Sequence, residues 1–235
     1  MQFRALATDY DGTLATHGSV SPEILQQLRR FVDAGYKLMM VTGRELRDLN
    51  RVFPHLDVFT LVVAENGGVL YDPARKCETL LCEPPSEQLV TSLRARGVPF
   101  SLGRAIIATF EPHEPAVREA VVEAGQPLHV ILNKGSIMVL PAGVDKASGL
   151  RHAVASLGIG SDSVVGIGDA ENDIEFLAAC GCGVAVANAL PSVKSSADFV
   201  VRGAHGAGVA EVMDILLRDG RLPCNGRERR FLVSE

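Results

Sequence analysis

The chain has 235 residues, of which 47% are hydrophobic and 22% charged, and its formal net charge is −5. This composition is typical of a globular protein with one large domain or two smaller ones. The acidic balance gives no electrostatic reason to expect nucleic acid or an anionic membrane as a partner. No stretch reaches the roughly 18 apolar residues of a membrane span, and the first residues do not resemble a secretory signal. We therefore expect a cytoplasmic protein.

Apolar runs and helical patterns alternate through the first 68 residues. A strand is predicted at 3–8, and a helix follows it, with Ser21 as N-cap and Pro22 at its first position. Further elements follow in the same rhythm: a strand at 37–43, a helix at 45–53 and a strand at 60–68. Continuous apolar strands separated by helices indicate a parallel sheet that is covered on both faces.

The pattern changes in the middle of the chain. Each predicted helix is followed there by two strands joined by a short turn, which indicates antiparallel hairpins. This helix-strand-strand unit occurs twice: helix 86–96 with strands 98–102 and 105–110, then helix 114–124 with strands 128–132 and 136–140. The borders are rich in proline, as linkers often are. We expect a small inserted α+β domain here.

After residue 145 the parallel rhythm returns. The predicted elements are helix 146–157, strand 163–169, helix 171–180, strand 183–187, a short helix, strand 198–201 and helix 207–218. We expect an α/β fold with a doubly wound parallel sheet. The expected domains are a core (1–74 and 144–218), an insert (75–143) and a tail (219–235).

Polar residues gather where the predicted parallel strands end. Asp9 and Asp11 follow the first strand, Thr42 follows the second, and Asp169 and Asp173 follow the strand at 163–169. Ligands of such folds lie outside the carboxyl ends of the strands, where these loops converge. Each residue also has a plain structural explanation, since Asp-Gly is a common turn and an acid in the first turn of a helix is favoured by its dipole. Together, those explanations are improbable.

The converging carboxylates suit a hard cation, in first place Mg²⁺. The cation would explain how Asp9 and Asp11 can be neighbours, because its charge compensates theirs. Lys146, at the start of the helix that follows the insert, would add a point charge suited to phosphate, and Thr42 would add a donor. Such a site is equipped for phosphoryl transfer through an aspartyl-phosphate.

Four segments resemble the motifs of the haloacid dehalogenase superfamily of phosphohydrolases. They are "DYDGT" (9–13), "VTG" (41–43), the single Lys146 and "GDAEND" (168–173), in that order. The insert stands where members with the second type of cap carry it. Together with "ENGG" (65–68), its repeated unit resembles the small cap of the Cof-like, sucrose-phosphatase and archaeal phosphoglycolate phosphatase group.

The resemblance implies a role for each motif residue. Asp9 would be the nucleophile and a metal ligand, and Asp11 the general acid and base, with its backbone carbonyl on the metal. Thr42, Gly43 and Lys146 would hold the phosphoryl group, and Asp169 and Asp173 would complete the Mg²⁺ site. The acid at position 11 favours a phosphatase over a dehalogenase.

The substrate would be a small phosphorylated metabolite, such as phosphoglycolate or a sugar phosphate, and the insert would select it. Arg104, in a turn of the insert, is a candidate for binding an anionic leaving group. We expect Arg44, Asn66 and Asn188 to lie near the rim of the site without a direct role.

Two alternatives stay open: a sugar-phosphate mutase or phosphotransferase of the same superfamily, and a non-enzymatic phospho-receiver module. Turnover of p-nitrophenyl phosphate would separate the receiver from an enzyme. The sequence gives no oligomeric state.

Overall fold

An eight-stranded sheet forms the larger part of the molecule. The computed structural model describes residues 3–133 and 135–222. The strand order is β12-β11-β10-β1-β2-β3-β4-β5. The strands from β12 to β3 are parallel to their neighbours, whereas β4 and β5 are antiparallel additions at one edge. Their bounds are β1 Ala5–Thr8, β2 Lys37–Val41, β3 Leu61–Ala64, β4 Val69–Asp72, β5 Cys77–Leu80, β10 Val164–Gly168, β11 Cys182–Ala185 and β12 Phe199–Val200.

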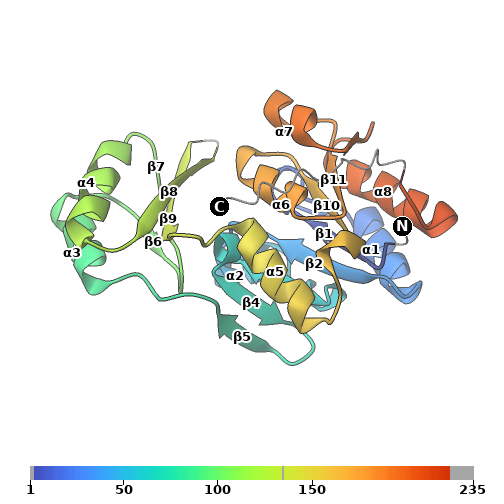
Figure 1. Ribbon diagram of the computed structural model, residues 1–235, viewed down its shortest axis with the longest axis horizontal. Coiled ribbons are helices and arrows are strands. Elements are labelled where there is room, and N and C mark those ends of the chain that lie inside the picture. The colour runs from blue at the N-terminus through green and yellow to red at the C-terminus, as the bar shows by residue number, and fades with distance from the viewer. Residues whose placement is uncertain (1–2, 134, 223–235) are drawn as a thin grey trace, which may run out of the picture.

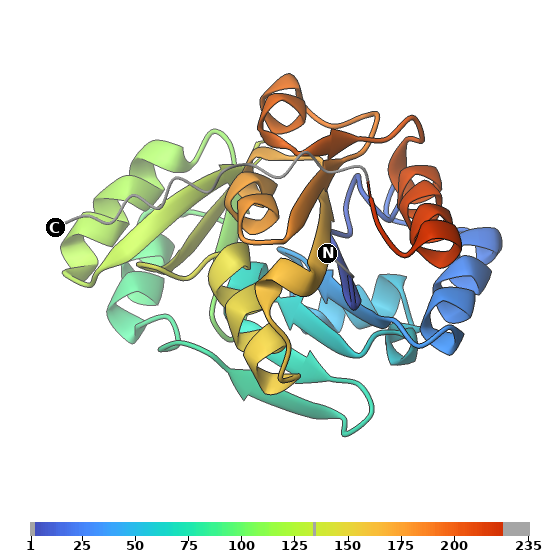
Figure 2. The same cartoon turned by 45° about the vertical axis from the view of Figure 1, so that its right-hand side comes forward.

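Helices cover both faces of this sheet (Figures 1 and 2). Helices α1 and α8 pack against each other on one side, and α5 and α6 lie on the other. One continuous core of buried apolar side chains fills the space between sheet and helices. The α-helices of the larger part are α1 Pro22–Asp33, α2 Leu46–Val52, α5 Lys146–Ser156, α6 Ile174–Ala178, α7 Pro191–Ser196 and α8 His205–Asp219. Short 3-10 turns are η1 Leu56–Val58, η2 Glu65–Gly67, η3 Ser161–Ser163 and η4 Glu171–Asp173.

The order of the strands brings the predicted site residues to one edge. Strand β1 lies between β10 and β2, and all three run in the same direction. Their carboxyl ends therefore lie side by side, and Asp9, Asp169 and Thr42 are the first or second residues beyond them. This point, where the chain order of the strands reverses, is where α/β sheets of this kind bind ligands.

A second, four-stranded antiparallel sheet lies beside the larger part (Figure 1). Its order is β6-β7-β9-β8, and it is built from two helix-strand-strand units, as predicted. One face packs on α3 and α4 over a separate small core. The bounds are α3 Glu87–Ala95, β6 Ser101–Leu102, β7 Ile107–Phe110, α4 Glu114–Ala124, β8 Leu128–Asn133 and β9 Ser136–Pro141.

The predicted fold class is confirmed, and most elements agree with their predicted positions to within a few residues. Strands β4 and β5 are an addition: they pair with β3 and extend the larger sheet. The insert predicted from residue 75 therefore leaves the larger sheet only after Leu80. Strand β5 is short and mostly exposed, so it has no apolar run for sequence analysis to detect. Its place at the sheet edge comes from pairing with β4.

Two further observations concern the ends and the membrane. Helix α8 ends at Asp219, and its C-cap Gly220 adopts a left-handed conformation (φ 65°). The predicted tail lies outside the described residues from position 223 onward. Among residues 3–133 and 135–222, no helix has the length and apolar character needed to cross a bilayer.

Candidate active site

A buried lysine joins two of the predicted acids. Lys146, the first residue of α5, has 2% of its side-chain surface exposed, and its Nζ lies 2.6 Å from Asp9 Oδ1. The same Nζ lies 2.6 Å from Asp173 Oδ1. The other oxygen of Asp173 accepts hydrogen bonds from the backbone N–H groups of Asp169 (2.9 Å) and Ala170 (3.0 Å). Asp173 therefore fixes both the lysine and the loop that follows β10.

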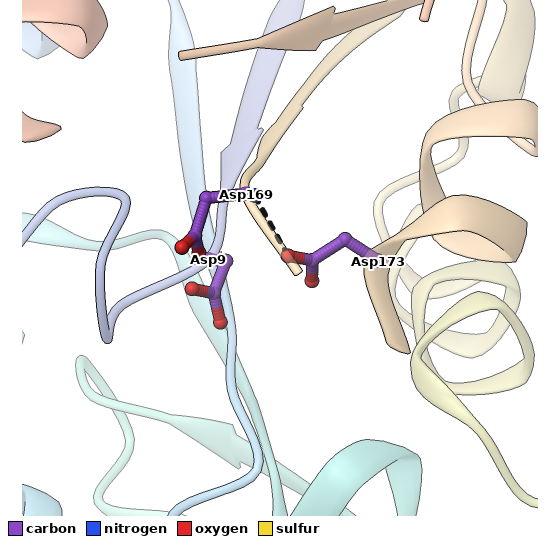
Figure 3. A group of neighbouring side chains, drawn as sticks. All are labelled: Asp9, Asp169 and Asp173. Carbon is purple, nitrogen blue, oxygen red and sulfur yellow. Dashed lines mark hydrogen bonds between the residues drawn. The ribbon is translucent and has the colours of Figure 1, made fainter. Parts of the chain in front are cut away.

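Asp9, Asp169 and Asp173 form one group of buried carboxylates. Each offers an oxygen, and these three oxygens all lie within 4.8 Å of one another. Asp9 and Asp169 extend from neighbouring strand ends, and Asp173 faces them from the helical side (Figure 3). The Thr13 hydroxyl donates to Asp169 Oδ1 over 2.9 Å and so orients this carboxylate. Gly12 (φ 87°) leaves room for it, because a Cβ there would lie 2.4 Å from Asp169 Oδ2.

Burial and neighbouring charges shift the pKa values within this group. Burial, together with the neighbouring carboxylates of Asp173 and Asp169, raises the pKa of Asp9 to about 7 against the opposing effect of Lys146. Burial alone would lower the pKa of Lys146, but Asp173 and Asp9 outweigh this, and its pKa lies above its usual range. Two buried carboxylates thus contact one ammonium group, and a third carboxylate, that of Asp169, lies beside them. A cluster of buried carboxylate oxygens fits a divalent cation such as Mg²⁺.

Thr42 and Gly43 border a cleft between the two sheets. The cavity measures ≈ 200 Å³, and its core side includes Asp9, Asp11, Thr42, Gly43 and Lys146. The opposite wall is supplied by the small sheet, through Ala108, Thr109, Asn133, Ser136 and Met138. Arg44, Ala170 and Asn172 complete the lining. The structure thus brings all the predicted core-side residues to one cavity or to the carboxylate group that adjoins it.

The Asp11 side chain pairs with Arg44, which the sequence predicts near the rim of the site without a direct role. Arg44 Nε lies 2.6 Å from Asp11 Oδ2, and Arg44 Nη2 lies 2.7 Å from Asp11 Oδ1, which makes a bidentate pair. Arg44 Nη1 is hydrogen-bonded to Asp48, the third residue of α2. The guanidinium also lies 5.5 Å from the centroid of the Tyr10 ring. Arg44 therefore holds the Asp11 carboxylate at the mouth of the cleft.

Two further residues hold the loop that follows Asp9. The Gly12 carbonyl accepts a hydrogen bond from Asn188 Nδ2 over 2.7 Å, and His205 Nδ1 lies 2.9 Å from the same oxygen. Asn188 Oδ1 accepts from the His205 backbone N–H, which links the two. Asn188 was predicted near the rim, but His205 and Thr13 were not singled out. Their role depends on which loops meet in space, and no local pattern signals it.

Arg104 lies outside the cleft. Its guanidinium pairs with Glu78 of β5 at 2.9 Å, and both side chains are at least 40% exposed. Its backbone N–H donates to the buried Glu65, which holds this turn. The structure does not bring Arg104 into the lining of the cleft that contains Asp9 and Lys146.

The fold and the carboxylate group define a class: α/β proteins with buried acids, Asp9 and Asp169, where the parallel strands β1 and β10 end. A family model described as haloacid dehalogenase-like hydrolase matches residues 6–96 and 126–213. The chain belongs to this family, and the predicted membership is confirmed.

Curated relatives agree with this assignment. A phosphoglycolate phosphatase of Methanothermobacter thermautotrophicus is 37% identical over 89% of this chain and 97% of its own. Another, from Pyrobaculum neutrophilum, is 32% identical over 94% of this chain and 98% of its own. A solved haloacid dehalogenase-like hydrolase from Bacteroides thetaiotaomicron superposes with a TM-score of 0.79 over 92% of this chain and 100% of its own, at 19% identity. The predicted enzyme class, a hydrolase of the phosphatase type, is therefore confirmed.

Proposed function

We propose that this protein is a Mg²⁺-dependent phosphatase that hydrolyses a small phosphate ester through an aspartyl-phosphate on Asp9. One observation carries the proposal: Asp9 lies between Lys146 and two further buried carboxylates, and it borders the same cleft as Asp11. A nucleophilic carboxylate needs its charge compensated and its geometry fixed, and this surrounding supplies both.

In the first half-reaction Asp9 attacks phosphorus. Because Lys146 holds Oδ1, we assign the attack to Oδ2. The bond between phosphorus and the ester oxygen breaks, and the departing oxygen takes a proton from the Asp11 carboxyl group. The products are an acyl phosphate on Asp9 and the free alcohol. Asp11 is protonated before this step and ionised after it.

In the second half-reaction Asp11 acts as a base. It removes a proton from a water molecule, whose oxygen attacks phosphorus, and the bond to Asp9 breaks. Inorganic phosphate leaves, and both carboxyl groups return to their starting states. Arg44 positions the ionised Asp11 at the mouth of the cleft, because the guanidinium pairs with both of its carboxylate oxygens. When Asp11 is protonated, the oxygen that carries the proton gives up its hydrogen bond to Arg44, and the other oxygen keeps the contact.

Asp9, Asp169, Asp173 and the Asp11 backbone carbonyl would hold Mg²⁺. The cation would supply charge stabilisation for the transferring phosphoryl group. Lys146 and the donors of the Thr42–Gly43 turn would bind its oxygens. This assignment of roles follows the resemblance stated above, and the described geometry supports it.

The relatives' names support phosphoglycolate as the first candidate substrate. The cleft of ≈ 200 Å³ supports a small leaving group. We keep the cytoplasm as its expected location. Membership of a hydrolase family favours the enzyme over the phospho-receiver alternative.

The test is release of inorganic phosphate by purified protein. Phosphoglycolate, glucose 6-phosphate and p-nitrophenyl phosphate are compared in the presence of Mg²⁺, of excess chelator, and of Ca²⁺. We expect phosphoglycolate to have the highest kcat/KM, with activity lost in chelator. Ca²⁺ should bind and inhibit, because it prefers more ligands at longer distances and would engage both Asp9 oxygens.

Full activity in chelator would overturn the metal assignment. Transfer of the phosphoryl group to an added sugar faster than to water would favour the phosphotransferase alternative.

A further inference from the structure

The Glu65-Asn66-Gly67-Gly68 segment, which we call the junction segment, occupies an unusual place in the fold. It follows β3 directly, and Glu65 and Asn66 both adopt left-handed backbone conformations with φ of 51° and 53°. Two such residues in succession are unfavourable without compensating contacts. Both side chains are almost fully buried, at 3% and 1% exposure. The hydrogen bonds of these two side chains compensate for the unfavourable backbone conformation.

The Glu65 carboxylate binds the turn that connects β6 to β7. Its Oε1 accepts from the Arg104 N–H at 3.1 Å, and its Oε2 accepts from the Ala105 and Ile106 N–H groups at 2.7 and 3.1 Å. Hydrogen bonds to an ionised acceptor are the stronger kind, and three of them converge here. The buried Glu65 side chain therefore ties the small sheet to the core at this end.

The junction segment and the small sheet approach each other closely at this turn. A Cβ on Gly103 would lie 2.5 Å from Glu65 Oε2, and a Cβ on Gly68 would lie 2.2 Å from the Ala105 Cβ. A Cβ on Gly67 would lie 1.9 Å from the carbonyl oxygen of Asp145, in the connection that leads from β9 back to the core. Both the turn and the return connection of the small sheet thus rest on the junction segment.

The same segment contacts the phosphate side of the cleft. The Glu65 N–H donates to the Arg44 carbonyl, and the Asn66 N–H donates to the Thr42 carbonyl, each over 2.9 Å. Asn172, which lines the cleft, donates from Nδ2 to Asn66 Oδ1 over 3.1 Å. The junction segment therefore links the backbone of the phosphate-binding turn to the small sheet.

We propose that Glu65 is the positioning residue that sets the small sheet over the catalytic cleft. From the turn it holds, β7 extends about 13 Å, at ~3.3 Å per residue, to Phe110, which pairs with the cleft residue Ser136. A change at the turn is carried along this strand to the wall that faces Asp9. Glu65 touches neither substrate nor metal in this account, and its effect on substrate selection rests on the proposed function.

The test is Glu65→Gln, with Glu78→Gln as the matched control. Glutamine keeps the shape of the side chain, but its amide nitrogen cannot accept, so at least one buried N–H group of the turn loses its partner. Glu78 also touches this turn, through the Arg104 guanidinium, yet it is exposed. Each variant thus removes one carboxylate that contacts the turn between β6 and β7, but only Glu65 is a buried acceptor of its backbone N–H groups.

Two measurements are expected to move together in Glu65→Gln. Hydrogen exchange of the Arg104, Ala105 and Ile106 amides should quicken by about 10- to 100-fold, while the amides of β1 and β10 stay as slow as in the wild type. KM for phosphoglycolate should rise about 10-fold or more, with a smaller change in kcat and little change for p-nitrophenyl phosphate. Glu78→Gln should match the wild type in every respect.

If the two variants behave alike, the proposal is wrong. Equal losses on the two substrates, with exchange quickened in β1 and β10 as well, would show a general loss of stability and also overturn it. The exchange measurement needs no activity, so failure of the proposed phosphatase function is seen separately. If Glu65→Gln does not fold, Gly103→Ala replaces it, because the added Cβ would lie 2.5 Å from Glu65 Oε2. This variant should show the same faster exchange in the turn and the same rise in KM for phosphoglycolate. Wild-type behaviour of a folded Gly103→Ala would contradict the proposal.

Discussion

At the scale of single residues, the burial of Asp9 among other charged groups is the property with most consequence for function. Asp9 is only 4% exposed and shares the ammonium group of Lys146 with Asp173. Without a cation, burial raises the pKa of its carboxyl group to about 7, so Asp9 is largely protonated at lower pH. Binding of Mg²⁺ must displace this proton. The pH dependence of metal binding therefore reports directly on the arrangement of these residues.

We expect Mg²⁺ affinity to fall as the pH drops below about 7, by roughly tenfold per pH unit because one proton is displaced. Calorimetric titration with Mg²⁺ at several pH values measures this slope. Asp9→Asn is the control, and the pH-dependent slope should be absent there. An affinity of the wild type that is constant across this range would contradict the assignment of Asp9 as a buried ligand.

The same group makes metal-free stability depend on pH. The folded pKa of Asp9, about 7, lies above its ordinary value of 3.8, so protonation favours the folded state. This contribution is fully present below pH 3.8 and is lost as the pH rises through about 7. The melting temperature of the metal-free protein should therefore decline more steeply between about pH 5 and 8 than that of Asp9→Asn. A parallel decline in both proteins would mean that Asp9 is ionised throughout.

At the scale of elements, the turn from β2 into α2 combines residues that line the cleft with Arg44, which pairs with Asp11 and with α2. Thr42 and Gly43 line the cleft that we propose to bind the phosphate group, and Arg44 pairs with Asp11 while it contacts Asp48 in the first turn of α2. Helix α2 thus serves as the support of the Arg44 side chain. Orientation of a general acid and base contributes substantially to rate, so this support should be visible in kinetics.

Arg44→Ala is expected to lower kcat/KM by about 10- to 100-fold, because Asp11 loses the pair that orients it. Arg51→Ala is the matched control, since Arg51 also pairs with Asp48 but is 79% exposed and does not reach the cleft. The measurement is steady-state phosphate release. Equal activity of the two variants would remove Arg44 from the reaction.

Sequence patterns predicted the elements that depend on local signals and missed contacts between distant ones. The buried strands before Asp9, Thr42 and Asp169 are apolar runs, which sequence analysis detects. Neighbouring parallel strands have their carboxyl ends at the same edge of the sheet, so these three residues can be placed together without knowing the loop conformations. Strand β5 lacks such a run, and only pairing with β4 recruits it. Sequence analysis names Arg44 and the "ENGG" segment that begins at Glu65, but it does not predict their contacts, because the partners are 33 and 39 or more residues away. Arg104 was predicted from its turn alone, and the tie of that turn to Glu65 directs its side chain elsewhere.

At the scale of the whole molecule, the cleft belongs to neither sheet alone. The core supplies the carboxylates and Lys146, and the small sheet supplies a wall of mostly neutral side chains. A second cavity of ≈ 450 Å³ shares Gly43, Arg44 and Ala108 with the first and extends along Ser101 and Ile106. We keep the division into a core domain and a cap domain as a proposal, with the cap as the part that selects the substrate.

The central claim is that Asp9 carries the phosphoryl group, and the most direct measurement is to identify that group on the protein. Asp11→Asn keeps the nucleophile but cannot activate water, so phosphoenzyme should accumulate during reaction with phosphoglycolate and Mg²⁺. Acid quenching and peptide mass spectrometry should locate one phosphoryl group on Asp9, and the double variant with Asp9→Asn should carry none. A wild type that hydrolyses phosphoglycolate while Asp11→Asn acquires no phosphoryl group, or acquires it on a residue other than Asp9, would contradict the account.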